Sequence, residues 1–391
     1  MTLYAVTGIA QGLDATEAAV QATDQALNQV GRAQIVLAFV AASDDYPVRQ
    51  VVNGVSGLLS DTPLFGFSTP SQLTSDGIFQ RSIAVALLIS DEVQARADFW
   101  AGYTEDSKRC TQYMLETLHM DEAEPKALLL VADGFNADST PMIQALTEGK
   151  YPLAGCLAGG DLASNRAFQI GGIRSGNNGL AAAVLRGNIK VSVGSNHGWQ
   201  SVGVYSRITR SKGLWVRNLD GRRASETYAR NFGHPAREWA YPPLNQLIRL
   251  YPLGVERDEI GEAGQASYLV RSPLSVETDG SLRMNVSVPQ GKTAYLLVSS
   301  AENCLAATRL ATQQALEGLE GAQPALALIF ADIAWSMMLQ AQTGSEISAV
   351  QSVLGKDVPI IGGYNYGQVG RNHDGKPELF NQHIQIVLFG E

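Results

Sequence analysis

A phrase of proline, an apolar residue, any residue and glycine occurs three times in this chain, and it constrains the fold more than any other feature. The copies are PLFGFSTPSQL from Pro63, PLAGCLAGGDL from Pro152 and PIIGGYNYGQV from Pro359. Proline can open a strand, where its missing N–H does no harm, and a nearby glycine lets the backbone turn sharply or approach a ligand. The repetition predicts one local structure used three times, with Gly66, Gly155 and Gly362 at equivalent positions.

Each copy is flanked by apolar segments rich in strand-forming residues. These segments cover residues 35–40, 127–131 and 326–330 before the copies, and residues 83–89, 180–185 and 384–389 after them. Between the upstream strand and the phrase lies a stretch whose apolar residues have helical spacing, as in residues 48–59. The repeating unit is therefore predicted to be strand, helix, short strand, glycine loop, strand. Such units favour right-handed crossovers and sheets that are at least partly parallel.

The middle of the chain follows a different pattern. Residues 214–230 predict a strand, a turn at Asp220-Gly221 and a helix, and the proline-rich residues 239–251 have no clean strand period. Residues 266–299 predict an antiparallel meander with hairpin turns, followed by a helix over 304–319. The expected fold class is α/β of the mixed α+β kind, with repeated strand-helix-strand units and a meander in the C-terminal half. Residues 239–251 are interpreted as the junction between two halves.

Charge and cysteine content narrow the functional classes. The 391 residues hold 38 acidic and 29 basic side chains, a net charge of −9, which argues against nucleic-acid binding and against a basic membrane-surface patch. No apolar run approaches the roughly 18 residues needed to cross a bilayer, and the N-terminus does not resemble a signal peptide. The three cysteines are widely spaced and fit a reducing compartment. These features predict a cytoplasmic protein with no nucleic-acid or membrane partner.

The sequence does not match the catalytic motifs that parts of it superficially resemble. GFSTP at residues 66–70 has Pro70 where a nucleophile elbow has its second glycine, so Ser68 is not expected to be a nucleophile. GCLAGGD at residues 155–161 matches neither a Walker A loop nor GxGxxG. No two histidines have zinc-site spacing. We therefore expect a protein that is not an enzyme, although an α/β scaffold with an unrecognised catalytic pair is the second alternative.

Several residues have both a functional and a structural interpretation. Asp133 and Asp332 follow apolar strands, where they would face a ligand or cap the next helix. Cys156, in the second glycine loop, is either a pocket residue or a small buried hydrophobe. Arg271 would hold an acidic ligand group or form a structural ion pair. His197, in SNHGWQ, would be an axial haem ligand given open access by Gly198, or a turn histidine beside a core tryptophan.

Longer stretches of the chain resemble the FIST family. The resemblance rests on the three glycine-loop phrases, on VADGF from Val131, and on the segment at residues 202–228. It resumes at YLVRSPLSVETDGSLRMNVSVPQGKTAYLL from Tyr268 and ends with LFNQHIQIVLF near the C-terminus. The order and spacing of these segments resemble a FIST N-terminal domain at residues 1–235 followed by a FIST C-terminal domain at 236–391.

The resemblance implies a sensory module that binds a small ligand and signals through a separate protein, such as a kinase or a cyclic-dinucleotide enzyme. Some family members resemble haem sensors of nitric oxide, and the SNHGW segment is similar to theirs, which gives the alternative of a nitric-oxide sensor using His197. The chain departs from the family at two places. The segment at Ala331 lacks the Cys and Arg that family members often carry there, and Gln368 stands where they commonly have a glutamate. Glu346 matches the family's acidic position.

The candidate ligand site combines the glycine loops with the strand ends. Its predicted members are Asp133, Gly155, Cys156, Arg271, Asp332, Tyr364 and Gln368. No cofactor is certain, and haem is the alternative, held by His197. The alternating apolar strand at residues 384–389 is either a homo-oligomer contact or a core strand.

Overall fold

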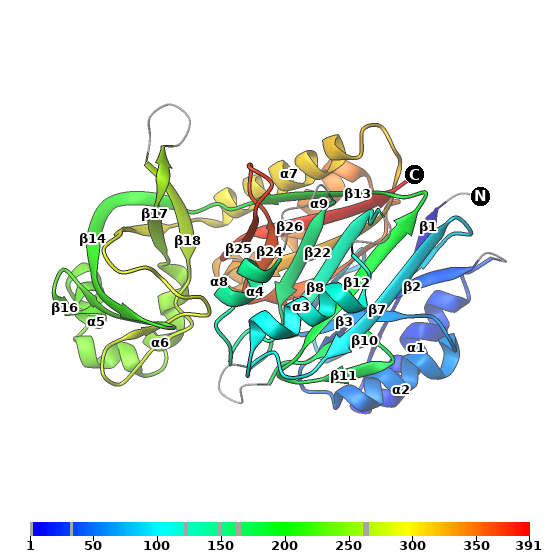
Figure 1. The fold of residues 1–391 in the computed structure, drawn as a ribbon, viewed down its shortest axis with the longest axis horizontal. Helices are drawn as coiled ribbons and strands as arrows, with labels where there is room; N and C mark the ends of the chain where they lie inside the picture. Colours follow the sequence, from blue (N-terminus) through cyan, green and yellow to red (C-terminus); the bar gives the residue numbers. More distant parts are fainter. Residues whose placement is uncertain (1–2, 32–33, 121–123, 147–150, 162–165, 261–265) are drawn as a thin grey trace.

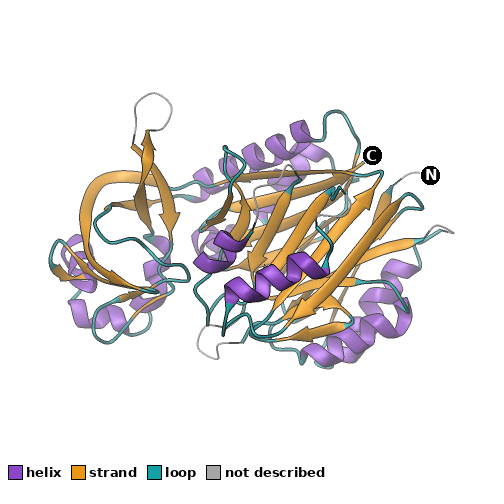
Figure 2. Cartoon of the chain, viewed as in Figure 1, coloured by secondary structure: helices purple, strands orange, loops and turns teal. Residues whose placement is uncertain are grey.

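The chain forms a larger body of three sheets and a smaller body built from residues 200–298, at the left of Figure 1. The structure is a computed structural model that describes residues 3–31, 34–120, 124–146, 151–161, 166–260 and 266–391. Figure 2 shows long strands packed face to face, with helices on the outer surfaces. Among the described residues, no helix is long and apolar enough to cross a membrane.

Three repeats build the larger body, each running edge strand, helix, strand, helical segment, short strand, hairpin and return strand. The first repeat comprises β1 (Tyr4–Gln11), α1 (Ala15–Leu27), β2 (Ile35–Ser43), α2 (Val48–Leu59), β3 (Leu64–Thr69), β4 (Gln72–Thr74), β5 (Gly77–Phe79) and β6 (Ser82–Ile89). The second comprises β7 (Val93–Trp100), α3 (Ser107–Thr117), β8 (Ala127–Ala132), α4 (Thr140–Ala145), β9 (Leu153–Leu157), β10 (Gln169–Gly172), β11 (Arg174–Gly176) and β12 (Leu180–Gly187). The third comprises β13 (Lys190–Asn196), α7 (Ala301–Gly318), β22 (Pro324–Asp332), α8 (Ile333–Leu339), α9 (Ser345–Leu354), β23 (Ile360–Asn365), β24 (Gln368–Arg371), β25 (Pro377–Phe380) and β26 (Ile384–Gly390).

The three sheets have the same strand order, because each repeat lends its hairpin to another repeat. The orders are β1-β6-β2-β3-β10-β11, β7-β12-β8-β9-β24-β25 and β13-β26-β22-β23-β4-β5. The pairs β2–β3, β8–β9 and β22–β23 are parallel, and the return strands are antiparallel. Strand β26 lies in the interior of its sheet and is buried throughout. The mixed α+β fold is confirmed, as is the core-strand interpretation of residues 384–389.

The glycines of the three phrases are equivalent, as the sequence predicted. Gly66, Gly155 and Gly362 are each the third residue of the short strand, and the register places them opposite Val40, Leu130 and Ile329. A Cβ on these glycines would lie 2.5, 2.1 and 2.3 Å from the carbonyl oxygen of the opposite residue. Glycine is therefore required here for close strand approach.

A second equivalence lies at the start of each return strand, and it was not foreseen. Arg81, Asn178 and Gln382 occupy the same place in the three repeats, in the turn that leads into the return strand. All three have left-handed backbones, with φ of 48°, 58° and 61°. The next residue in each repeat donates a hydrogen bond to a buried glutamine: Ser82 to Gln72, Gly179 to Gln169 and His383 to Gln368. Gln368, in the third glycine loop, is thus one of three equivalent glutamines that bind this turn.

The smaller body is inserted between β13 and α7 of the third repeat. It comprises β14 (Gln200–Lys212), β15 (Trp215–Leu219), β16 (Arg222–Arg223), α5 (Ala224–Phe232), α6 (Leu244–Leu247), β17 (Leu253–Ile260), β18 (Ala266–Arg271), β19 (Ser275–Val276), β20 (Leu282–Arg283) and β21 (Thr293–Val298). All its strand pairs are antiparallel, as expected for the meander. The expected domain boundary between residues 235 and 236 falls inside this smaller body. In space the chain divides instead into residues 200–298 and the remainder.

Candidate ligand-binding cleft

A cleft of about 780 Å³ lies between the two bodies, where strands of all three repeats end. Asp44 and Asp45 follow β2, Gly160 follows β9, and Tyr366 follows β23. Ligands on sheets of this kind collect beyond the carboxyl ends of the strands. The opposite wall comes from the smaller body, whose lining residues include Pro242, Asn245, Gln246, Arg249, Leu274, Ser275 and Arg283. The proline-rich segment that the sequence placed at a junction thus forms one wall of the cleft.

Arg249 is the most unusual cation in the cleft. Its side chain is 8% exposed, its Nε donates to the carbonyl oxygen of Leu274 at 3.2 Å, and its guanidinium carbon lies 5.5 Å from the centre of the Tyr366 ring. No described carboxylate forms an ion pair with it. Burial lowers the pKa of Arg249, and the more distant charge of Asp332 partly opposes this effect. A buried guanidinium without a carboxylate partner favours an anionic ligand.

Two further polar groups in the cleft lack partners. Arg283 donates from Nη2 to the carbonyl oxygen of Phe135 at 2.7 Å, but its buried Nε has no hydrogen-bond partner among the described residues. The buried side-chain oxygen of Asn245 also has none there. Because unsatisfied buried polar atoms cost free energy, they mark a place where a ligand or water would be bound favourably. Two residues that line the cleft thus carry, among the described residues, an unused donor and an unused acceptor.

The facing wall is acidic. Asp45 accepts from Arg166 at 3.2 Å and lies 3.8 Å from Arg81, so its charge is already balanced. Asp44 accepts from the backbone N–H of Asp161 at 2.9 Å. Burial raises the pKa of Asp44 above its usual value, and the neighbouring Asp45 adds to the effect. The Tyr366 hydroxyl donates to the Gly160 carbonyl oxygen, which leaves its ring as a flat surface beside Arg249.

The predicted site residues lie behind the cleft wall. Asp332 is buried at the N-cap of α8, where it accepts from the backbone N–H groups of Ala334 and Gln382. Its helix-cap interpretation is confirmed, and burial raises its pKa to about 6. Asp133 accepts from the backbone of Phe135 and Asn136 within a turn. Ile333, which follows Asp332, lines the cleft instead.

The glycine-loop residues are also internal. Gly155 and Cys156 lie within β9, and Cys156 is fully buried with a raised pKa, so it is a small buried hydrophobe. Tyr364 donates to Glu346, the residue that the resemblance singled out. Gln368 donates from Nε2 to the side-chain oxygen of Asn365 at 2.6 Å. These buried contacts hold the third glycine loop in place next to Tyr366.

Arg271 lies away from the cleft. It donates to the carbonyl oxygen of Leu379 at 2.7 Å, between the smaller body and β25. Burial lowers its pKa to about 10, and the nearby Glu378 carboxylate opposes this shift. Glu378 itself pairs with Arg257 at 2.6 Å. Arg271 therefore helps to join the two bodies, and Arg249 takes the place beside the glycine loops that the sequence had suggested for Arg271.

The surroundings of His197 do not fit an axial haem ligand. Its Nδ1 accepts from the backbone N–H of Trp199 at 3.2 Å, which places the proton of the neutral ring on Nε2. A histidine that binds iron through Nε2 needs the opposite tautomer, with Nδ1 donating. The ring packs 4.8 Å from His383, and burial lowers the pKa of His197 to about 4. Among the described residues, no group of three His, Cys, Asp or Glu could hold a metal ion.

The neighbours of His197 serve packing. Trp199 is 2% exposed and donates its indole N–H to the Gln382 carbonyl oxygen, so the core-tryptophan interpretation is confirmed. The expectation that Gly198 opens access to the imidazole is wrong, because a Cβ there would lie 2.6 Å from the backbone of Asn303. Glycine at this position lets the chain pass close to the start of α7. Ser68 is equally enclosed: its hydroxyl donates to Gly159 and accepts from Phe168.

Sequence reasoning missed Arg249, Arg283 and Asn245. The signal available was an arginine inside the apolar run Leu247-Ile248-Arg249-Leu250, because a charged residue among apolar neighbours is costly to bury without a function. Nothing in the sequence distinguished Arg283 from the other arginines.

Comparison with known proteins identifies the family. The structure is that of a mixed α+β protein with a cleft between its two bodies that is lined largely by polar and charged residues. A model of the FIST N domain matches residues 34–222, and a model of the FIST C domain matches residues 224–371. The chain belongs to the FIST family, whose domains are sensory.

Other comparisons add little. No curated protein matches the sequence. A chorismatase crystal structure is 8% identical with a TM-score of 0.35, covering all of both chains. A phosphoribosylformylglycinamidine synthase II from Thermotoga maritima is 11% identical with a TM-score of 0.22, covering 100% of this chain and 72% of its own. Likenesses of this strength support no argument about function.

Proposed function

We propose that this chain is a non-enzymatic sensory module that binds a small molecule with a carboxylate or phosphate group in the cleft. The observation that carries the proposal is Arg249, a buried guanidinium that lines the cleft beside Tyr366 and has no carboxylate partner in the described part of the chain. The unused donor of Arg283 and the unused acceptor of Asn245 supply further hydrogen-bonding positions. The bound molecule would be sensed by the contacts that join the two bodies.

The proposed setting is the cytoplasm, where the three free, buried cysteines would stay reduced. The signal would pass to a separate protein, such as a kinase or a cyclic-dinucleotide enzyme. The unrecognised-enzyme alternative would use the raised pKa of Asp44 for proton transfer, and it predicts turnover of the bound molecule.

Thermal unfolding with a panel of small carboxylates and inorganic phosphate tests the proposal. A molecule that binds the folded state raises the midpoint, and the effect grows with concentration. Arg249→Gln should abolish the upshift, whereas Arg230→Gln, on the exposed face of α5, should leave it unchanged. An upshift that survives Arg249→Gln would contradict the proposed site. Chemical conversion of the bound molecule during incubation would favour the enzyme alternative.

A further inference from the structure

The second repeat departs from the other two at one equivalent position. The sheet register aligns Gly8 of β1, Asp98 of β7 and Gly194 of β13, because each lies two strands from Val40, Leu130 or Ile329. A Cβ on Gly8 would lie 2.0 Å from the Ala22 carbonyl oxygen, and one on Gly194 would lie 1.8 Å from that of Ala311. Glycine therefore lets α1 and α7 lie directly on their edge strands.

Asp98 removes this close approach in the second repeat. Its carboxylate accepts from Nε of Arg174 at 2.8 Å, and α3 packs against α4 rather than along β7. Trp100, two residues further along β7, fills part of the space and packs in the core with Cys110 and Met114. The remaining space is an open groove of about 610 Å³ between the end of β7 and α3. The groove thus lies where the second repeat departs from the other two.

One lining residue of the groove, Trp100, has an indole N–H without a partner in the described part of the chain. Trp100 is 5% exposed. A tryptophan N–H usually finds an acceptor when it is buried. Tyr113, 60% exposed, borders the same groove and offers an aromatic surface. A carbonyl oxygen of a bound peptide segment would satisfy the indole, and an adjacent side chain would pack on the tyrosine.

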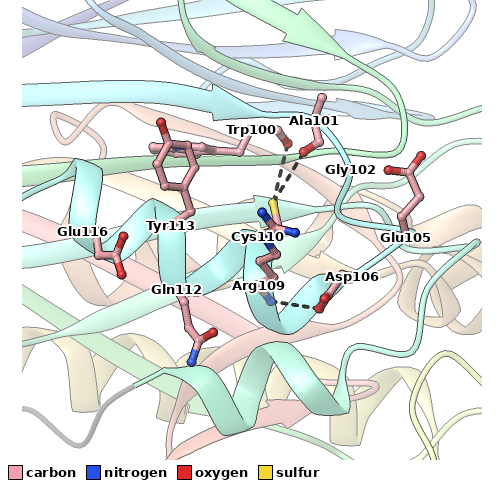
Figure 3. A pocket seen from close by; sticks show the side chains of 10 residues that line it. All are labelled: Trp100, Ala101, Gly102, Glu105, Asp106, Arg109, Cys110, Gln112, Tyr113 and Glu116. Atoms are coloured by element: carbon pink, nitrogen blue, oxygen red, sulfur yellow. Dashed lines mark hydrogen bonds between the residues drawn. The ribbon is translucent and has the colours of Figure 1, made fainter.

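The rim is acidic. Figure 3 shows Glu116 at one end and Glu105 with Asp106 at the other, with Tyr113 and Arg109 between them. Asp106 accepts from the backbone N–H of Arg109 as the N-cap of α3. The Arg109 side chain forms no ion pair with these carboxylates among the described residues, so it offsets one of three negative charges. The groove therefore complements a basic side chain.

We propose that the α3 groove docks an extended segment of a partner protein that carries an arginine or lysine. The basic side chain lies between the Glu105–Asp106 end and Glu116, against Tyr113, and a main-chain carbonyl oxygen reaches the Trp100 indole. The groove shares no residue with the ligand cleft. The proposal therefore stands or fails separately from the proposed ligand.

Calorimetric titration of the full chain with the blocked peptide Gly-Arg-Ala-Arg-Gly tests it. Saturable binding that weakens with salt is expected, and Glu105→Lys with Glu116→Lys should reduce affinity at least about tenfold. Glu302→Lys with Glu317→Lys, the same charge change on exposed positions of α7, should leave affinity unchanged. Circular dichroism confirms that each variant is folded.

Three outcomes would overturn the proposal. One is the absence of saturable binding. The second is an equal loss of affinity in the Glu302→Lys, Glu317→Lys control, which would mean that only the net charge matters. The third is binding of arginine amide as tight as that of the peptide, which would make the groove a site for small cations. Loss of peptide affinity in Trp100→Phe, which removes the indole N–H and keeps an aromatic ring, would support the carbonyl contact.

Discussion

The side-chain amide of Gln382 donates a hydrogen bond of 2.6 Å to the main-chain carbonyl oxygen of Arg249. Gln382 stands just before β26 in the larger body, and Arg249 belongs to the smaller one. The main-chain carbonyl oxygen of Gln382 accepts hydrogen bonds from the indole N–H groups of Trp199 and Trp335. One left-handed residue thus fixes the segment that carries the cleft arginine relative to the larger body. We infer that the cleft is pre-formed, because its two walls are joined by buried hydrogen bonds.

Gly155→Ala should destabilise the protein strongly, by about 3 kcal/mol or more. The added Cβ would lie 2.1 Å from the Leu130 carbonyl oxygen, and neither β8 nor β9 can retreat from the core. Gly57→Ala, in α2 with open space around it, is the matched control and should stabilise by about 0.5 to 1 kcal/mol. Urea unfolding measures both. A similar small effect from the two substitutions would contradict the close-approach argument.

Asp332 should make stability depend on pH between about 4 and 6. Its folded pKa of about 6 lies above the ordinary value of 3.8, mainly because it is buried. The folded state then holds the proton more tightly than the unfolded state, so this contribution is present below pH 4 and is lost as pH rises through 6. Its size is up to about 3 kcal/mol.

The measurement is the free energy of unfolding across this interval in the wild type and in Asp332→Asn. The difference between the two proteins should change with pH in the stated direction, with the wild type losing stability relative to the variant as pH rises. Parallel curves would show that Asp332 does not titrate in this range.

Glu320→Gly should stabilise the protein by about 0.5 to 1 kcal/mol. Glu320 follows α7 with a φ of 51°, where glycine is preferred. The substitution also removes an ion pair with Lys190, but both side chains are largely exposed and such pairs contribute little. Lys190→Ala removes the same pair without changing the turn and should have almost no effect. Thermal unfolding of both variants decides whether the backbone or the charge dominates.

Haem added to the purified protein should give no Soret band that depends on His197. The reason is the hydrogen bond from the Trp199 backbone to Nδ1, which leaves Nε2 protonated. Absorbance spectra of wild type and His197→Ala are therefore expected to coincide. A Soret band present in the wild type and lost in His197→Ala would instead establish the haem-sensor alternative.

The sequence alone determined the repeat, the strand-helix-strand units and the family. Proline and glycine act through the local backbone, so the equivalence of Gly66, Gly155 and Gly362 could be predicted from their spacing. Helical periodicity likewise placed α2 at its observed residues. These features depend on neighbours in the chain, and the chain displays them directly.

Tertiary structure decided which residues face the cleft. The exchange of hairpins among the three sheets joins residues that are 100 or more positions apart, as in the pairing of β10 with β3. Asp133 and Asp332 stand at the ends of their strands as predicted, yet backbone N–H groups bind their carboxylates, and of the residues that follow them it is Ile333 that lines the cavity. Arg249 becomes the cleft cation because the smaller body buries it against Tyr366, at a distance in sequence of more than 100 residues. Burial and missing partners give a side chain its role here, and both depend on packing that no local pattern encodes.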